Sequence, residues 1–538
     1  MSNTPSPLIY NTPSVTNTPL EASLTLVNAR VVTLDPQRSI ARAVAVRGKK
    51  IIAVGSNKEI RRFVGPKTKV LDARNGTVVP GLVDCHVHMT GFGFFLQSVD
   101  LHGVGSVKEM QEKLRQYSRE NPGKSWIEGG RWDQELLAEK RMPTRWDLDE
   151  VIAERPVMLE RVCGHIGVAN SKALQLAGIT KETVVDGGKV DLDCKTGEPS
   201  GIVRENALGV VSEAIPKPRL AQLEEACILA SKKAVEAGLT GVHWMVESVD
   251  EIRLLRKLDS EGKLPLRVYL GVSVRLLDEL EHSSLLKDVG GGMVKMGFVK
   301  ILADGSLGAH TAALNKPYAD KPETRGMLLY SQRTLDGLVL KVHKAGFQLA
   351  IHAIGDRATE AVLKAYEKAL KSSARPDHRH RIEHCSVLNP RLIKWMKRLG
   401  VVASVQPHFV VSDFWIIDRV GKKRVRWTYP FKTLLRKGLV VVSGSDCPVE
   451  NINPILGIWA ANRKNAPQER LTVNGALRTY TSNAAYASFD EDNRGSIEVG
   501  KTADFTILSD SLRFATPIMT RNITVKTTIV DGKPVYMR

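Results

Sequence analysis

Short apolar runs alternate with longer amphipathic stretches through the middle of the chain. The runs are rich in Val, Ile and Leu, which is typical of strands that are buried on both faces. The stretches between them include 218–237, 333–345 and 357–371, which have the pattern of helices. Strands that alternate with helices predict a parallel α/β arrangement. The eight predicted strands cover residues 82–88, 239–245, 266–272, 294–302, 347–353, 380–384, 401–407 and 439–444.

Eight strands with alternating helices are the pattern of a (β/α)8 TIM barrel, whose active site forms at the carboxyl ends of the strands. We therefore predict an α/β fold with a TIM-barrel domain over residues 80–489. The long gap after the first strand predicts a large insertion at about 92–217. Because this gap contains WIEGGRWDQ and RPVMLERVCGH, which are typical of folded segments, it is expected to be more than a linker.

Both ends of the chain contain short strand-like segments, and neither group is large enough to fold alone. We predict that residues 23–79 and 490–538 together form one small β-sandwich domain. Residues 1–22 are rich in Pro, Thr, Asn and Ser, which predicts a disordered tail. The strand-like segments at the two ends cover residues 24–34, 43–47, 51–54, 504–508 and 523–537.

The composition is that of a soluble globular protein, with 43% hydrophobic and 25% charged residues among 538. No apolar run reaches about 18 residues, so we expect neither a membrane span nor a signal peptide. The six cysteines are scattered and form no C-x-x-C pair, which favours reduced thiols and a cytoplasmic location. The oligomeric state stays open, a homo-oligomer included.

The formal net charge of +19 suggests nucleic acid or an anionic surface as a binding partner. However, Lys and Arg are spread along the chain and mixed with acidic residues. The densest basic patch, 419–426, is short and has no interleaved aromatic residues on which bases could stack. We therefore expect a small-molecule substrate as the partner in place of nucleic acid.

The segment VVPGLVDCHVHMT carries the first candidate metal ligands. Side chains alternate between the faces of a strand, so His86 and His88 point the same way, with Asp84 on the same face. Two neutral imidazoles on one face form a metal site easily. A lone His-x-His is nevertheless more often a surface pair, so the prediction depends on further ligands downstream.

Further polar residues follow the ends of later predicted strands. Lys300, His352, His384 and Asp446 stand at the ends of the fourth, fifth, sixth and eighth strands. Each has an ordinary structural explanation when taken alone, such as a solvated lysine or a hydrogen-bonded core histidine. Their recurrence at the end where a TIM barrel forms its active site favours a joint role in metal binding.

This set of residues predicts hydrolytic chemistry at one or two divalent ions, with Zn²⁺ favoured. Four histidines and one carboxylate can hold two ions if a further group bridges them. Lys300 could supply the bridge after reaction with CO₂, because a carbamylated lysine is anionic and an ammonium would repel the ions. Asp446 could bind one ion and accept a proton from the water that such ions acidify to a pKa of about 7.

The chain resembles the amidohydrolase superfamily, and within it the amidohydrolase-3 group with the YtcJ-like hydrolases and the N-substituted formamide deformylases. The resemblance covers nearly everything from about 24 to 538. It rests on the segments PGLVDCHVH, RWDQELLAEKRMPTRWDLDEV, GHIGVANSKAL, GEPSGIVREN, VKILADGSLGAHTAAL, IHAIGDRA, RIEHCSVL, SVQPHF, GSDCPVE, TSNAA and GSIEVGKTADFTIL.

The resemblance implies a role for each candidate residue. The metal-ligand positions of the family fall on His86, His88, Lys300, His352, His384 and Asp446. His165 matches a family histidine that faces the site, so it is a candidate for catalysis or substrate binding as well as for structure. Gln406 and His408 are candidates for the wall of the substrate pocket. Supporting or structural roles are expected for Asp304, Asp356, Arg357 and His243.

The predicted function is metal-dependent hydrolysis of a C–N bond that is not a peptide bond, in an amide or an N-acyl or N-formyl amine. Asp446 would be the general base. The same ligands could also support hydrolysis of a lactone, another ester or a phosphoester, because specificity depends on the pocket walls. A non-catalytic interaction protein on this fold is a further alternative, which loss of ligands would indicate, and none is lost here.

Overall fold

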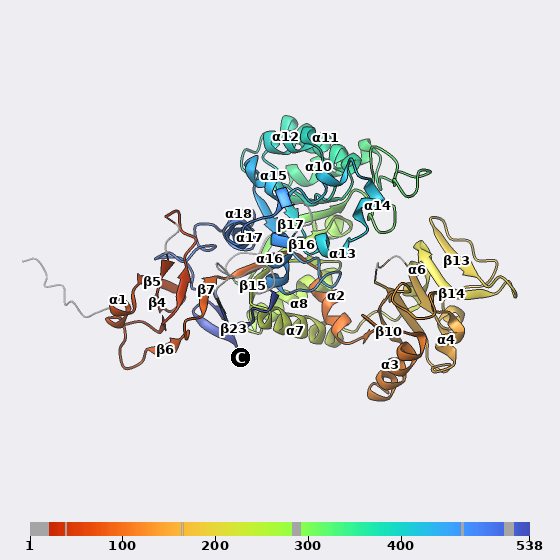
Figure 1. The fold of residues 1–538 in the computed structure, drawn as a ribbon, viewed down its shortest axis with the longest axis horizontal. Helices are drawn as coiled ribbons and strands as arrows, with labels where there is room; N and C mark the ends of the chain where they lie inside the picture. Colours follow the sequence, from red (N-terminus) through yellow and green to blue (C-terminus); the bar gives the residue numbers. More distant parts are fainter. Residues whose placement is uncertain are drawn as a thin grey trace, which may run out of the picture.

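An eight-stranded parallel sheet forms the centre of the molecule (Figure 1). The computed structural model describes residues 21–37, 40–162, 164, 166–281, 292–463, 467–510 and 521–538. The tail predicted over residues 1–22 therefore lies almost entirely outside the described residues. The strands pair in the order β21-β20-β19-β18-β17-β16-β15-β8. They are β8 (Leu82–Val87), β15 (Leu239–Val246), β16 (Arg267–Ser273), β17 (Val294–Leu302), β18 (Gln348–Ala353), β19 (Arg381–His384), β20 (Val402–Val405) and β21 (Val441–Ser443).

The two outer strands of this sheet, β8 and β21, meet just beyond the end of β21. A parallel bridge joins Val87 to Cys447, and the backbone N–H of His88 donates to the carbonyl of Cys447 at 2.9 Å. The sheet is thereby nearly closed into a barrel, which confirms the predicted (β/α)8 fold. Each predicted strand overlaps one observed strand.

Most of the barrel strands are rich in apolar residues because both of their faces are covered. All residues of β15 are buried, and helices such as α7 (Leu220–Glu236), α10 (Gln332–Lys344) and α11 (Asp356–Ser372) surround the sheet. A single large cluster of buried apolar side chains joins the helices to the strands. This burial holds the strand ends in a fixed relation to one another, which a site built from several strands requires.

Strands from both ends of the chain lie together beside the barrel, on the left of Figure 1. In one sheet, β22 (Phe505–Leu508) pairs antiparallel with β7 (Thr77–Pro80). Apolar side chains of this sheet and of a second, four-stranded sheet form one buried cluster. The domain boundaries at 79/80 and 489/490 stay a prediction. The remaining strands are β24 (Lys533–Met537), β23 (Val525–Val530), β2 (Arg30–Val32) and β3 (Ile40–Ala41) in the first sheet, and β5 (Lys50–Gly55), β4 (Ala43–Arg47), β1 (Leu24–Val27) and β6 (Lys69–Asp72) in the second.

The predicted strand over 24–34 is wrong as a single element. The structure divides it into β1 and β2, which belong to different sheets. Asn28, between them, has a φ of 51°, and Asn tolerates this left-handed conformation better than most residues. The turn at Asn28 sends the chain from one sheet to the other.

A separate six-stranded sheet forms between the first two barrel strands (Figure 1, right). The short helix α2 (Met89–Leu96) leads from β8 toward it. Within the described residues, no helix is long and apolar enough to cross a membrane. The strands of this sheet are β9 (Val99–Asp100), β10 (Ile127–Trp132), β11 (Val157–Arg161), β12 (Ile166–Ala169), β13 (Gly188–Leu192) and β14 (Pro199–Glu205).

Candidate metal centre

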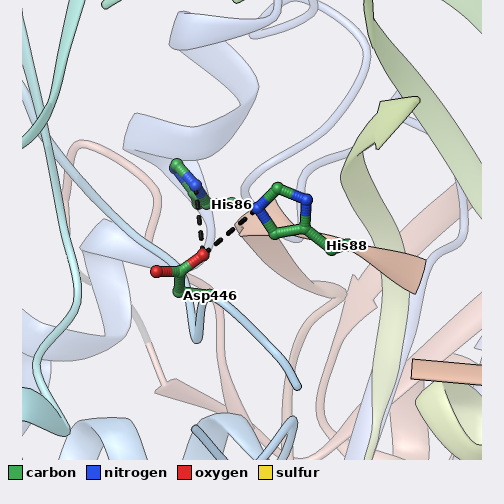
Figure 2. Close-up of side chains that lie close together, drawn as sticks. All are labelled: His86, His88 and Asp446. Atoms are coloured by element: carbon green, nitrogen blue, oxygen red, sulfur yellow. Dashed lines mark ion pairs between the residues drawn. The ribbon is translucent and has the colours of Figure 1, made fainter. Parts of the chain in front are cut away.

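His86, His88 and Asp446 come together where β8 and the segment after β21 meet (Figure 2). One carboxylate oxygen of Asp446 lies 3.3 Å from Nε2 of His86 and 3.4 Å from Nε2 of His88. The backbone N–H of Asp446 also donates to the carbonyl of His86 at 2.7 Å. The three side chains therefore present two imidazole nitrogens and a carboxylate to one point.

The other three predicted ligands lie beside this group. The Lys300 Nζ is 3.1 Å from Nε2 of His86. The ring of His384 has its centre 5.0 Å from that of His86 and 4.3 Å from that of His352. The structure thus brings all six predicted ligands together at the carboxyl ends of the barrel strands.

Two of these residues have unusual backbone conformations. His384 has a φ of 73° and Asp446 a φ of 60°, both in the left-handed region that residues with a Cβ rarely adopt. Such conformations cost about 1–3 kcal/mol each and persist where the surrounding structure imposes them, often at functional sites. Here each residue ends or follows a barrel strand, and the turn directs its side chain toward the shared point.

Two of the histidines, His352 and His384, are held in the neutral form that a metal ligand must have. Burial lowers the pKa of His352 to about 3, and the charge of Lys300 adds to the shift. Burial also holds the pKa of His384 well below its usual value. Burial raises the pKa of Asp446, but the neighbouring His86 and His88 outweigh it and hold that pKa well below the usual range.

The donor set fits a divalent metal ion. Nδ1 of His384 is buried and has no hydrogen-bond partner among the described residues, which is rare for a buried polar atom. Imidazole nitrogens and carboxylate oxygens are ordinary ligands of Zn²⁺ and related ions. An ion at this point would provide the missing partner, with His86, His88, His352, His384, Lys300 and Asp446 available to hold it.

A buried ion pair that sequence reasoning missed supports His86. Glu383 Oε2 lies 2.5 Å from Nδ1 of His86, and Arg381 donates to both oxygens of Glu383 at 2.8 and 2.9 Å. Arg381 also donates to the carbonyl of Cys85 and lies 2.7 Å from Nδ1 of His243. The carboxylate fixes the orientation of the imidazole and directs its Nε2 toward Lys300 and Asp446. The signal in the sequence was a pair of opposite charges, two residues apart, in a short strand that the barrel buries completely.

Asp84 and Asp304 bind backbone groups. Asp84 accepts from the N–H groups of His86 and Ser445, so it links the two segments that carry ligands. Asp304 accepts from the N–H groups of Ile354 and Gly355 and lies 3.5 Å from Nε2 of His352. Burial raises the pKa of Asp84 to about 6 and that of Asp304 to about 7, and these hydrogen bonds oppose the rise.

The remaining predicted residues are placed differently. Gln406 follows β20, and both polar atoms of its buried side chain lack a partner among the described residues. His408 pairs through Nδ1 with Glu450. Asp356 accepts from the N–H of Asn315, and Arg357 donates to the carbonyl of Gly326. His165 lies outside the described residues.

Comparison with known proteins agrees with this geometry. The model of the protein family described as "Amidohydrolase family" matches residues 69–536. The chain belongs to the amidohydrolase family. This amidohydrolase is therefore an enzyme, a metal-dependent hydrolase, and the resemblance inferred from its motifs is confirmed.

Two relatives match over almost their whole length. The amidohydrolase is 34% identical to YtcJ of Bacillus subtilis (strain 168) over 94% of this chain and 98% of the relative. It is 30% identical to the N-substituted formamide deformylase of Arthrobacter pascens over 96% of this chain and 98% of that enzyme. A crystal structure of a metal-dependent hydrolase from Pyrococcus furiosus superposes with a TM-score of 0.76 and 31% identity, over 91% of this chain and 99% of that one.

Proposed function

We propose that this amidohydrolase cleaves a non-peptide C–N bond, in an amide or an N-acyl or N-formyl amine. The observation that carries the proposal is the meeting of His86, His88 and Asp446 with the other three predicted ligands. The relative from Arthrobacter pascens is named a deformylase of N-substituted formamides, which supports an N-formyl or N-acyl substrate.

The proposed cofactor is Zn²⁺, with one or two ions per chain. A bound divalent ion lowers the pKa of a water to about 7 and polarises a carbonyl oxygen. In this proposal, Lys300 determines whether the site holds one ion or two. Its Nζ is buried 3.1 Å from a histidine nitrogen, where an ammonium would repel a cation. Carbamylation by CO₂ converts Lys300 into an anion that can bridge two ions.

Asp446 is the proposed general base. Its carboxylate is ionised and lies within 3.4 Å of the imidazoles of His86 and His88, so it can take a proton from the attacking water and pass it to the leaving nitrogen. Gln406 is the proposed partner of the substrate amide, since both of its buried polar atoms are unpaired among the described residues. Roles in substrate binding for His165 and His408 stay predictions.

Replacement of the general base tests this function. Asp446→Asn keeps the size of the side chain and one oxygen but removes the charge and the basicity. We expect kcat to fall by about 10²–10⁴-fold, the usual contribution of general acid–base catalysis. The assay uses the Zn²⁺-loaded enzyme with a panel of N-formyl amines, N-acyl amines, lactones and phosphotriesters, and circular dichroism checks the fold.

Two results of this assay would contradict the proposal. In the first, the wild-type enzyme hydrolyses lactones or phosphotriesters but no amide. This result would show that the enzyme cleaves an ester bond and not a C–N bond. A normal kcat for Asp446→Asn on a cleaved amide would show that another residue is the base.

We also propose a cytoplasmic location. Five cysteines, Cys85, Cys194, Cys227, Cys385 and Cys447, are free thiols in the described part of the chain, and four of them are buried. Free thiols are typical of proteins in a reducing compartment.

A further inference from the structure

Arg131 has an unusual position in the sheet of the insertion. It lies in β10, where the pairing with β11 shifts register between Gly130 and Trp132. Its φ is 70°, in the left-handed region. A bulge of this kind turns a side chain away from the direction that regular pleating would give it, and bulges are frequent beside active sites.

The guanidinium of Arg131 has no carboxylate partner among the described residues. Its central carbon lies 5.2 Å from the ring centre of Phe95 in α2, the helix that follows the metal ligand His88. By contrast, Arg161 on the neighbouring strand pairs with Asp133 at 2.8 Å. The stacking on Phe95 orients the Arg131 guanidinium but leaves its hydrogen-bond donors available.

Arg131 lines a cavity of about 620 Å³ that runs from the insertion to the barrel. Gly91 and Pro448, close in sequence to the proposed ligands His88 and Asp446, line the same cavity. The cavity is large enough for a small organic substrate.

The walls of this cavity combine aromatic rings with an excess of positive charge. Phe94, Phe95, Tyr117 and Trp126 contribute aromatic surface. Among the described residues that line the cavity, four side chains are cations and two are carboxylates. Because the cation Arg161 is paired with Asp133, the other three leave an excess of one positive charge. The six side chains belong to Lys124, Arg131, Arg161, Lys217, Glu128 and Glu160.

We propose that Arg131 is a substrate-binding residue that holds a carboxylate on the substrate. The inference rests on the proposed function and narrows its substrate class to N-acyl or N-formyl compounds that carry a carboxylate and an apolar or aromatic group. The guanidinium binds the carboxylate through paired N–H donors, and the aromatic walls contact the apolar group. The amide to be cleaved then extends toward His88 and Asp446.

A binding experiment tests this assignment without need of turnover. The Zn²⁺-loaded enzyme is titrated by calorimetry with 4-phenylbutyrate and, separately, with the uncharged 4-phenylbutanol. We expect the carboxylate to bind about tenfold or more tightly, as one charge-assisted hydrogen bond implies. In Arg131→Gln the two ligands should bind almost equally, and Arg131→Lys, which keeps the charge, should retain part of the preference.

A matched control is Arg115→Gln, which removes an exposed arginine from α3 (Val107–Glu120) of the same insertion. It should bind both ligands like the wild-type enzyme. If the preference persists in Arg131→Gln, the carboxylate binds elsewhere, for example to the metal, and the assignment is wrong. A wild-type enzyme that shows no preference, or that does not bind 4-phenylbutyrate, overturns it even if a variant does not fold.

A kinetic comparison separates this inference from the proposed function. The ratio of kcat/KM for N-formylphenylalanine to that for N-formylphenethylamine should fall about tenfold or more in Arg131→Gln. Failure of the wild-type enzyme to cleave any amide, together with an Arg131-dependent preference in the titrations, would refute the proposed bond and leave the carboxylate site standing. Cleavage of both compounds with a ratio unchanged by Arg131→Gln would refute the role of Arg131 alone.

Discussion

Glu383 contacts a proposed metal ligand, His86, through a buried hydrogen bond. Its carboxylate holds Nδ1 of His86 at 2.5 Å, and it is itself held by the buried Arg381. A carboxylate that is hydrogen-bonded to a metal-binding histidine orients the imidazole and increases its basicity. Removal of the carboxylate should therefore loosen His86 while all six proposed ligands remain.

We predict that Glu383→Gln weakens the binding of Zn²⁺ by about 10–100-fold, the usual effect of losing such a partner. The measurement is a competition with a chromophoric chelator, made on protein whose fold is checked by circular dichroism. The control is Glu360→Gln, which removes a carboxylate from an ion pair with Arg391 on the helical surface. Equal affinity in Glu383→Gln and the wild-type enzyme would contradict the positioning role.

Asp413 makes the stability of the fold depend on pH. Burial raises its pKa to about 7, although a hydrogen bond from Tyr429 opposes the rise. An aspartate in the unfolded chain has a pKa of about 3.9. Between about pH 4 and 7 the folded state therefore keeps a proton that the unfolded state has released, and stability falls as the pH rises through this window.

Asp413→Asn should remove this contribution to the pH dependence of the free energy of unfolding. The slope that one such group adds is at most about 1.4 kcal/mol per pH unit. Urea unfolding between pH 4.5 and 7 would show a flatter decline in the free energy of unfolding for the variant than for the wild-type enzyme. Asp418→Asn, at an exposed position nearby, should keep the wild-type slope. An unchanged slope in Asp413→Asn would show that its carboxyl ionises normally.

At the scale of elements, the close contact of α2 with α7 depends on Gly93. A Cβ at this position would lie 2.1 Å from the carbonyl oxygen of Ala226 in α7. Gly93→Ala should therefore lower the free energy of unfolding by about 1–3 kcal/mol, the usual cost of overpacking. Gly91→Ala in the same helix is the control, because its Cβ would meet nothing closer than 4.0 Å.

Chemical denaturation of the two variants measures this difference. In Gly91→Ala, stability should stay unchanged or rise, since Ala favours the helix by up to about 1 kcal/mol over Gly. If both variants have the stability of the wild-type enzyme, the two helices can separate at little cost. The approach of α2 to the barrel wall would then be looser than the structure indicates.

Most of the barrel strands could be predicted from the sequence because they are apolar runs bounded by clear breaks. The six residues could be proposed as ligands because each stands at or just after the end of a predicted strand, and the structure brings them close together. The turn at Asn28 was missed, since an apolar segment does not show where it passes from one sheet to another. The bulge at Arg131 was missed for a related reason, because strand pairing depends on contacts that are distant in sequence.

The pair formed by Arg381 and Glu383 shows a further limit. Charged residues inside a strand usually indicate a solvated face, yet both of these are fully buried and face each other. Their partners come from β8, β15 and β20, and only the closed barrel brings these strands together. Sequence spacing alone therefore indicates candidate ligands more readily than the buried residues that orient them.

At the scale of the whole molecule, the barrel supplies the proposed metal ligands and the insertion supplies Arg131. The cavity between them has walls from both parts of the chain. Under the two proposals, chemistry and specificity belong to different segments, which is common in TIM-barrel enzymes, where loops after the strands determine the substrate.

The most direct test of the account is the metal content of the purified enzyme. The protein is incubated with Zn²⁺, dialysed, and analysed by inductively coupled plasma mass spectrometry beside Lys300→Ala and the exposed control Lys344→Ala on α10. The account predicts that the wild-type enzyme and the control retain the same content, with two ions per chain if carbamylated Lys300 bridges them. Lys300→Ala should retain one ion or fewer. A wild-type enzyme that retains no divalent metal would contradict the account.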